Sequence, residues 1–493
     1  MLNWSKLFSF VISRKLFIAL LFVIIAYRII ICFNYTPEIS VGETNNIWNA
    51  VNVIDGKSLY SDPENTPFEI YQYTPVSQYP LLLSAYLLDS RSNNYTYNIM
   101  VFGRLFSLLF NIIAFYLLFL ILKNHLRIRP NLATVASILA FGLLTHLSFS
   151  IRPDAMSFMM VLLALYLFGK AYFEEKKYHY IFCSIAFSFS FFIKQDSFLI
   201  LSALGLVLLF LKEFKSVLAL SASFILSFLL FYLMFALIHG DFFSYSIFNG
   251  LNQESSMARV QLVFERYLHF YALIFFVSLF FLIYSLKTLS NKKTDYYLIS
   301  LYVVSFIIAL GTSAKEGSWI NYFTVFNTLA IVLLFYSINQ LNKGKNQSAI
   351  EFSVTMICSL VLMVFLLQQI FHYTSPFLKY SESKEYHHKL THNFNAFKQD
   401  AIKGDYKIFV YDKSLKLILY KNTLFPNTEY YGVSSFSKDN YQKLKSTEKL
   451  THIIGTISEN HEQFKTLDHF NILFDDFTNE KQILNFTIYT NEQ

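Results

Sequence analysis

Residues 148–168 read SFSIRPDAMSFMMVLLALYLF, and they place an arginine, a proline and an aspartate directly before a run with the composition of a membrane helix. One ionisable group at the centre of a bilayer costs about 2.5–3.5 kcal/mol on insertion scales, so charges kept next to such a run tend to line a cavity or to pair. Proline is tolerated in the first turn of a helix, where its missing N–H costs little. The stretch therefore predicts a membrane helix that begins near Asp154 and carries Arg152 and Asp154 at one end.

The composition of the whole chain excludes an ordinary soluble enzyme. Of its 493 residues, 54% are hydrophobic, 19% are aromatic and only 15% are charged. Apolar runs of about 20 residues, the length that crosses a hydrocarbon layer of roughly 30 Å, recur along the chain. We expect an α-helical polytopic membrane protein with about eleven transmembrane helices. The predicted segments are 16–33, 101–122, 132–149, 155–168, 180–192, 198–211, 216–238, 270–286, 297–310, 319–338 and 350–371. The two short segments that flank FFIKQDSF are also compatible with a re-entrant hairpin.

Lysine and arginine predict the orientation of the chain. They gather in the alternate loops SRK, KNHLRIRP, EEKKYHY, KEFK, KTLSNKK and NKGK, which the positive-inside rule assigns to the cytoplasm. The net charge of +7 is thus a topology signal and excludes nucleic acid as a partner. We expect a transmembrane domain over residues 1–371 with a large first outer loop (34–100), and a soluble α/β domain over 372–493 outside the membrane. The expected membrane is a bacterial inner or plasma membrane, with the N-terminus in the cytoplasm.

The polar tail after residue 371 contains short runs that predict strands. They are KIFVYD (407–412), LILY (417–420), THIIGT (451–456) and FNILFDDF (470–477). The tail also places His388 and His392 at helical i, i+4 spacing near Glu385, a pattern that can hold a metal. Because the spacing fixes no third ligand, a solvated or interface position is favoured for the two histidines, and no metal is expected.

Charged and polar residues are concentrated at the outer ends of the predicted spans. Any one of them is compatible with an ordinary interfacial anchor. As a set they indicate a site, because acids and bases occur together on the side where positive charge is otherwise scarce. Carboxylates beside a cationic cluster suit acid/base chemistry on a phosphate-bearing substrate. The candidates are the acids Glu43 and Asp154, the cations Arg104, Arg152, Lys194 and Lys315, and the polar residues Tyr60, Tyr73, Asn321 and Tyr322.

The order of several motifs resembles that of the GT-C glycosyltransferases. An acid early in the first outer loop is followed by DGKSLYSD, YTP, GRLFSLLF, RPDAMSFMMVLLALYLF, KQDSF and GSWINYF. The resemblance is strongest to the bacterial branch related to protein O-mannosyltransferases and lipid A aminoarabinose transferases, and it covers roughly residues 30–340. It implies transfer of a sugar from a polyprenyl phosphate to a hydroxyl outside the cytoplasm.

The resemblance also assigns roles to the two acids. It carries Glu43 onto the acidic motif of the first outer loop and Asp154 onto the second acidic position. Many relatives have an adjacent Asp-Glu pair where this chain has Gly42 and Glu43. If the missing aspartate is usually the base, Glu43 must replace it.

The residues fit an inverting transfer on physical grounds as well. A carboxylate, Glu43 or Asp154, takes the proton of the acceptor hydroxyl, whose oxygen attacks the anomeric carbon while the lipid phosphate leaves from the opposite side. The four candidate cations are expected to bind that phosphate, and the tyrosines and Asn321 to bind substrate. No cofactor or divalent ion is required, because the leaving group is already a stable anion. The expected partners are the lipid-linked sugar donor, a glycan, lipid or protein acceptor, and membrane lipids.

Two other classes of protein remain open at this point. A transporter uses charges nearer mid-membrane, broken helices and repeated halves, and the sequence shows no such symmetry. A polysaccharide polymerase or ligase also uses prenyl-linked donors but transfers a whole glycan. Uptake of solute into vesicles would indicate the transporter, and a product heavier by one sugar would indicate the single-sugar transferase.

Overall fold

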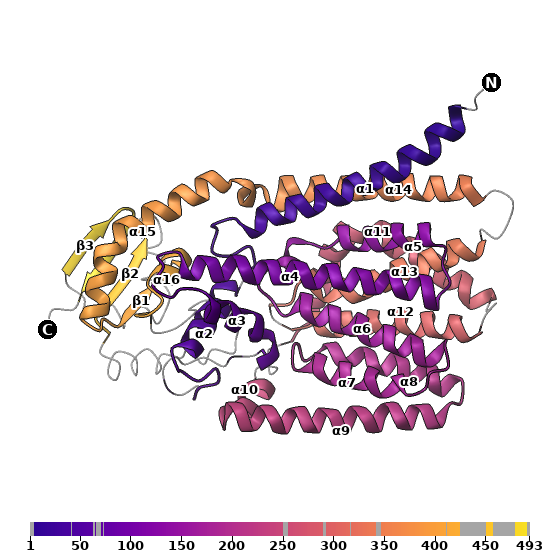
Figure 1. Cartoon of the computed structure of the whole chain (residues 1–493), viewed down its shortest axis with the longest axis horizontal. Helices are drawn as coiled ribbons and strands as arrows, with labels where there is room; N and C mark the ends of the chain where they lie inside the picture. The colour runs from indigo at the N-terminus through magenta and orange to yellow at the C-terminus, as the bar shows by residue number, and fades with distance from the viewer. Residues whose placement is uncertain are drawn as a thin grey trace.

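The computed structural model shows a long helical bundle with a small sheet at one end (Figure 1). It describes residues 4–40, 42–62, 65, 71, 73–249, 255–288, 292–315, 317–341, 347–410, 412–423, 450–456 and 479–490. Each of the eleven predicted apolar segments overlaps a helix of the bundle, although the segment 132–149 extends past Gly142, where α5 ends. These helices are α1 (Trp4–Cys32), α4 (Tyr95–Leu120), α5 (Pro130–Gly142), α6 (Asp154–Tyr172), α7 (His179–Phe191), α8 (Leu201–Phe210), α9 (Phe214–His239), α11 (Met257–Thr288), α12 (Lys292–Ser313), α13 (Thr324–Leu341) and α14 (Gln347–Gln368).

The length and composition of these helices confirm a polytopic membrane protein. Seven described helices are long and apolar enough to cross a membrane, and four shorter apolar helices accompany them. The short ones include α7 and α8, which flank FFIKQDSF. The count of about eleven spans stays a prediction.

Exposed apolar side chains show which helices face lipid. Along α9, Leu226 and Leu237 are 72% and 86% exposed, and α9 lies at the edge of the bundle (Figure 1). In contrast α13 lies inside, where Phe326 is fully buried against Tyr302 and Phe306. Contiguous apolar surface of this kind is unfavourable in water and favourable in hydrocarbon.

A buried arginine connects α1 to the end of α5. Arg28 is 1% exposed and donates from Nη2 to the carbonyls of Phe141 (2.7 Å) and Leu144 (3.3 Å). Its guanidinium also lies 4.2 Å from the centre of the Phe141 ring. The last carbonyls of a helix lack partners within the helix, and a cation there also complements the helix dipole. Arg28 therefore fixes the start of the segment that leads to α6.

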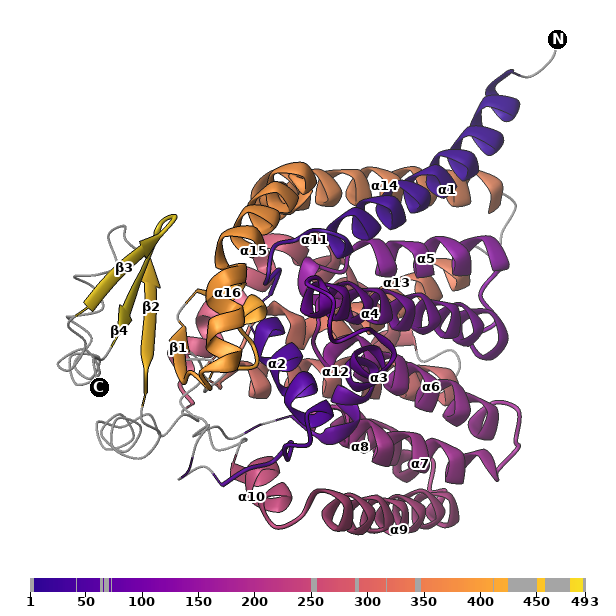
Figure 2. The same ribbon diagram turned by 60° about the vertical axis from the view of Figure 1, so that its left-hand side comes forward.

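The first outer loop and the C-terminal part lie at the same end of the bundle, opposite the N-terminus (Figures 1 and 2). The loop contains α2 (Glu43–Ile54), the short 3₁₀ helix η1 (Pro75–Gln78) and α3 (Tyr79–Leu87). The short α10 (Phe242–Asn249) follows α9 at this end. Four further 3₁₀ turns join the helices, namely η3 (His146–Phe149), η4 (Ser197–Ile200), η5 (Ile320–Phe323) and η7 (Ser375–Leu378), and π-helical turns η2 (Ile121–His125) and η6 (Gln369–Tyr373) extend α4 and α14.

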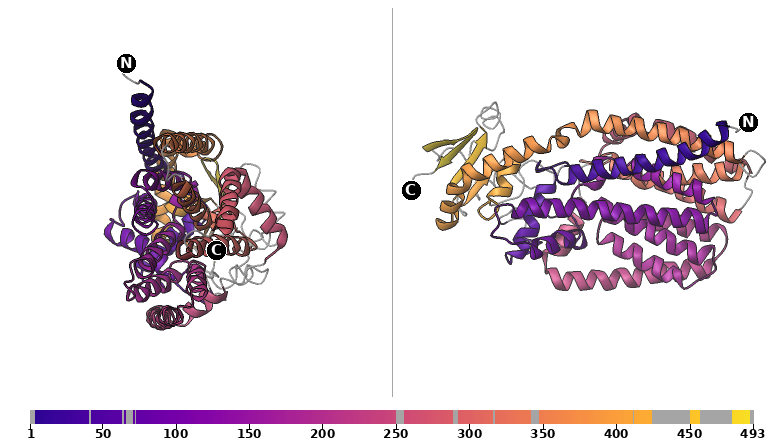
Figure 3. Two further views of the ribbon diagram at one scale, coloured as in Figure 1. Left: turned by 90° about the vertical axis from the view of Figure 1, so that its right-hand side faces the viewer. Right: turned by 45° about the horizontal axis from the view of Figure 1, so that its top comes forward.

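The C-terminal unit is a mixed sheet against a long helix (Figure 3). It contains α15 (Tyr380–Lys403), β1 (Ile408–Val410), α16 (Lys413–Ile418), β2 (His452–Thr456), β3 (Asn479–Ile483) and β4 (Phe486–Thr490). The strand order is β1-β2-β4-β3, in which β1 and β2 are parallel and the other neighbours are antiparallel. Leu390 and Phe394 of α15 pack against Ile454 and Phe486 of the sheet. The small α/β architecture of the tail is confirmed.

The strand predictions for the tail are partly correct. KIFVYD and THIIGT contain β1 and β2, whereas FNILFDDF (470–477) lies outside the described residues. The prediction for LILY was wrong, because α16 covers its first two residues and ends there. Asp412 caps that helix by accepting from the amide of Leu415 at 2.9 Å, and this local bond favours a helix over a strand.

The C-terminal unit docks on the first outer loop through α16, which contacts α2 and α4. Thr96 of α4 donates to the carbonyl of Leu417 at 2.8 Å, and the Leu417 side chain is buried in the cluster that includes Ile47 of α2. Tyr35 of the loop packs against Tyr380 and His387 of α15, with ring centres 5.8 and 5.1 Å apart. The two parts therefore form one continuous structure at this end.

Candidate active site

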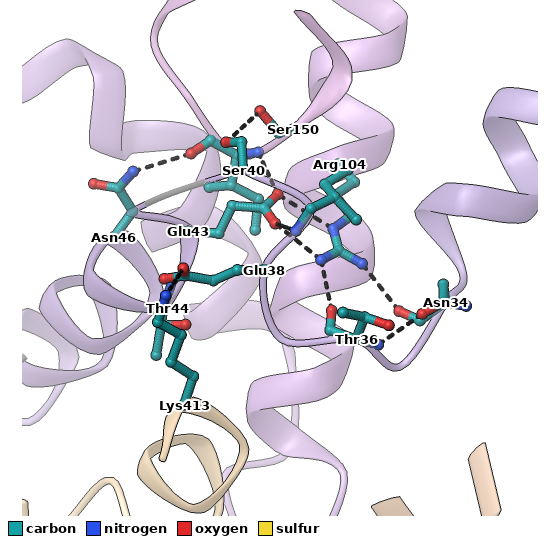
Figure 4. A network of polar contacts seen from close by, with 12 residues as sticks. Asn34, Thr36, Glu38, Ser40, Glu43, Thr44, Asn46, Arg104, Ser150 and Lys413 are labelled. Atoms are coloured by element: carbon teal, nitrogen blue, oxygen red, sulfur yellow. Dashed lines mark hydrogen bonds and ion pairs between the residues drawn. The ribbon is translucent and has the colours of Figure 1, made fainter. Parts of the chain in front are cut away.

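A buried ion pair lies at the base of the site (Figure 4). Glu43 and Arg104 both have 0% exposed side chains, and Nη2 of the arginine lies 2.9 Å from Oε2 of the glutamate. Arg104 Nε donates to the other oxygen at 3.2 Å. The backbone amides of Ile39 and Ile151 each donate to one carboxylate oxygen at 2.7 Å. Glu43 therefore accepts four hydrogen bonds and has no exposed oxygen.

Arg104 also uses its hydrogen-bond donors within the protein. Its Nη1 donates to the carbonyl of Asn34 at 2.9 Å and its Nη2 to that of Thr36 at 2.8 Å. These bonds hold the first residues of the outer loop against α4, as Figure 4 shows. The geometry leaves no face of this guanidinium open to a phosphate.

The ion pair and its neighbours position the segment that enters α6. Asn111 and Ser107 of α4 donate to the carbonyls of Ser148 (2.6 Å) and Ser150 (2.8 Å). Asn46 of α2 donates to the carbonyl of Ile151 at 3.0 Å, while Glu43 accepts from the amide of that residue. Side chains from two helices thus fix the backbone immediately before Arg152.

Asp154 begins α6, as predicted, and lies at the centre of a second polar cluster. Its Oδ1 accepts from Lys194 at 3.0 Å and from Asn321 at 2.6 Å, and its Oδ2 accepts from Arg152 at 3.1 Å. The ammonium of Lys194 also lies 4.3 Å from the centre of the Tyr322 ring. The structure therefore brings together five of the ten candidate residues.

The Asp154 cluster surrounds only a small cavity. This cavity measures about 60 Å³ and is lined by Asp154, Lys194, Asp196 and Asn321, among others. Pockets for small-molecule ligands usually measure about 300–1,000 Å³, so this space is far below the size of a ligand pocket.

A much larger cavity lies next to the same segment. It measures about 620 Å³, and its lining includes the cations Arg152, Arg259 and Lys413, the acid Glu38, and Trp319. Arg259 donates from Nη2 to the carbonyl of Ser318 at 2.9 Å, and its buried Nε has no hydrogen-bond partner among the described residues. Three cations and one carboxylate around a space of this size suit a sugar phosphate. Arg152 belongs to this cavity and to the Asp154 cluster at once.

The remaining three predicted residues, Lys315, Tyr60 and Tyr73, do not line the large cavity either. Burial lowers the pKa of Lys315, which lies within electrostatic reach of Asp196 and Lys194. Tyr60 is buried and donates to the carbonyl of Tyr73 at 2.9 Å. Tyr60 also packs against His239 and Phe243 in an aromatic cluster. Their roles in binding substrate stay predictions.

Sequence reasoning missed three residues of the large cavity, namely Glu38, Arg259 and Lys413. Glu38 precedes Glu43 in the same loop, where the motif drew attention to the second acid alone. Lys413 lies in the polar tail and reaches the cavity only through the docking of α16.

The two histidines of the possible metal pattern, His388 and His392, lie on α15. No cluster of three metal-binding side chains occurs among the described residues.

We expect Glu43→Gln to destabilise the protein. The variant leaves Arg104 as a buried charge and turns an amide N–H₂ toward other donors, and breaking a buried ion pair typically costs about 3–5 kcal/mol. Thermal unfolding of the purified protein should show a large fall in midpoint, which Glu43→Gln combined with Arg104→Met partly reverses because no charge is then left unpaired. Normal stability in Glu43→Gln with loss of activity alone would contradict this structural role and favour the base predicted from sequence.

The comparisons with known proteins agree with this architecture. The family model described as dolichyl-phosphate-mannose-protein mannosyltransferase matches residues 96–239, from α4 to the end of α9. No curated protein matches the chain by sequence.

Solved structures resemble the chain over nearly its whole length. ArnT from Cupriavidus metallidurans in the apo state has a TM-score of 0.64 at 9% identity, covering 96% of this chain and 98% of that one. The same protein bound to undecaprenyl phosphate has a TM-score of 0.61 at 9% identity, covering 97% and 98%. The oligosaccharyltransferase AglB from Archaeoglobus fulgidus, in complex with an inhibitory peptide and a dolichol phosphate, has a TM-score of 0.54 at 11% identity, covering 99% and 75%. The resemblance seen in the motifs is thus confirmed, and the chain has the fold of the GT-C glycosyltransferases.

Proposed function

We propose that this protein is a membrane glycosyltransferase that moves one sugar from a polyprenyl phosphate to a hydroxyl acceptor on the non-cytoplasmic face, with inversion. The observation that carries the proposal is the large cavity, which joins three cations and an acid at one end of a GT-C bundle. The likeness in fold to ArnT, solved with undecaprenyl phosphate, supports a lipid phosphate as donor. A bacterial inner or plasma membrane is the proposed location.

The reaction needs a base, an open face on the sugar and a stabilised leaving group. The acceptor O–H bond breaks as its oxygen bonds to the anomeric carbon, and the bond from that carbon to the phosphate oxygen breaks with its electron pair on the phosphate. Arg152 and Arg259 stabilise the charge of the leaving phosphate from the cavity wall. Because this leaving group is already a stable anion, the proposal requires neither a nucleotide nor a divalent ion.

The acids and cations behind the cavity have positioning roles in this proposal. Asp154 has charged or amide donors on both oxygens, so it holds Arg152 and Lys194 in place. Glu43 fixes the amide of Ile151 and thereby the backbone that carries Arg152. Lys315 adds to the positive field near Lys194. Accordingly the site recognises phosphate by preorganised charge rather than by a flexible lysine alone.

Transfer of a whole glycan is the second candidate, favoured by the likeness in fold to an oligosaccharyltransferase. The two functions differ in the product. Mass spectrometry of an acceptor incubated with purified protein distinguishes a gain of one sugar from a gain of an assembled glycan. Turnover with a nucleotide sugar and no lipid donor would contradict both.

Removing the cavity arginine should slow transfer. Arg152→Ala loses a charge-assisted interaction worth about 1.5–3 kcal/mol, so we expect a rate roughly ten- to a hundredfold lower with polyprenyl phosphate sugar. Arg91→Ala is the matched control, because Arg91 is an exposed arginine of the first outer loop. Equal rates for the two variants would exclude Arg152 from phosphate binding.

The orientation can be tested with single cysteines, because Cys32, Cys183 and Cys358 are all buried. Gln399 is exposed on α15, and Lys177 is exposed between α6 and α7 in a loop predicted to be cytoplasmic. A membrane-impermeant thiol reagent should label Gln399→Cys in intact cells and Lys177→Cys only after lysis. The reverse pattern would place the large cavity on the cytoplasmic side.

A further inference from the structure

The large cavity contains one carboxylate among the described residues that line it, and this is Glu38 of the first outer loop. Its Oε2 lies 2.6 Å from Nζ of Lys413. Its Oε1 accepts only one long bond in the structure, 3.3 Å from the amide of Thr44. Figure 4 shows the carboxylate of Glu38 next to Thr44 and Lys413. At least one oxygen of Glu38 therefore keeps capacity to accept a proton.

The other candidate acids lack that capacity. Glu43 is fully buried and accepts four hydrogen bonds. Asp154 accepts three charged or amide donors and lines the small cavity, whose volume is far below that of an ordinary ligand pocket. A general base must come within about 3 Å of the hydroxyl that it deprotonates. Of the three acids, Glu38 alone combines an oxygen that accepts just one long hydrogen bond with a position on the large cavity.

We propose that Glu38 is the general base of the transfer and that Lys413, carried by the C-terminal unit, orients it and contacts the donor phosphate. This rests on the proposed function. The acceptor proton passes to Oε1 of Glu38 as the new glycosidic bond forms, and then to water. An ammonium has three N–H donors, so Lys413 contacts Glu38 with one and has others for a phosphate oxygen in the same cavity.

The position of both residues is built into the fold. Arg104 and Glu43 bond the backbone at Thr36 and Ile39, the residues that flank Pro37 and Glu38. Lys413 starts α16, which Asp412 caps and whose Leu417 carbonyl is bonded by Thr96. The pair thus joins two firmly held segments. Both side chains line the large cavity, and Glu38 is 9% exposed and Lys413 36% exposed.

The first test separates a base from a structural acid. Glu38→Gln should lower the transfer rate at least about 10²-fold, the usual cost of a lost general base, while binding of undecaprenyl phosphate changes less than about twofold. Its unfolding temperature should stay near that of the wild type, in contrast to Glu43→Gln. Added formate should partly restore transfer in Glu38→Ala, because a small carboxylate then replaces the missing base. Near-normal transfer by Glu38→Gln would overturn the proposal.

The second test concerns Lys413. Lys413→Met should raise the KM for the donor about tenfold, since one charge-assisted contact to phosphate is lost. The control is Lys407→Met, a lysine of the C-terminal unit with similar exposure (37%) that pairs with Asp405. Equal KM values for the two variants would exclude a contact between Lys413 and the donor.

The proposed function and the assignment of Glu38 as the base can be disproved separately. If the wild-type protein transfers no sugar from any polyprenyl phosphate, the proposed function fails before any variant is made. If the wild type transfers sugar and Glu38→Gln does so equally well, only the assignment of the base is wrong.

Discussion

The ion pair between Glu43 and Arg104 is the interaction on which the rest of the site depends. Removing two charges from water is costly, and it is offset here because both carboxylate oxygens and all three guanidinium nitrogens have hydrogen-bond partners. The pair joins the entry of the first outer loop, α4 and the backbone at Ile151. Together with the hydrogen bond from Ser40 to Ser150, it fixes Arg152 relative to Glu38, although the two residues come from segments more than a hundred residues apart.

The two neighbouring cavities differ in the balance of charge around them. In the ion-pair cluster around Asp154, the acids Asp154 and Asp196 balance Lys194 and Arg152, so these paired charges nearly cancel and hold one another in place. In the large cavity three cations face one acid, which leaves an excess of positive charge for an anionic ligand. Arg152 belongs to both. The closed cluster therefore fixes the orientation of an arginine that also lines the large cavity.

Much of the fold could be predicted from sequence, because hydrocarbon forces every backbone polar group to bond within its own helix, and long apolar runs then have few alternatives. The start of α6 was predicted for a local reason, the proline before Asp154. The tail was harder: in LILY one capping bond from Asp412 outweighs strand propensity. The partner of Glu38 lies 375 residues away, and no local pattern connects Lys413 to the first outer loop. The burial of Glu43 could not be predicted from the sequence either, because the motif identifies an acid but does not indicate whether its side chain faces solvent or a guanidinium.

The position before Glu43 explains why acidity in this loop is divided between two sites. Gly42 has φ 91°, in the left-handed region that disfavours side chains, and it is the residue from which α2 starts. A Cβ there would meet no atom within 4 Å, so the constraint is on the backbone and not on space. The chain thus uses this position for the turn that directs Glu43 inward to Arg104, and the acid that faces the large cavity comes from Glu38, on the other side of the turn. One loop thereby supplies a buried acid that holds the structure together and a second acid that remains accessible to substrate.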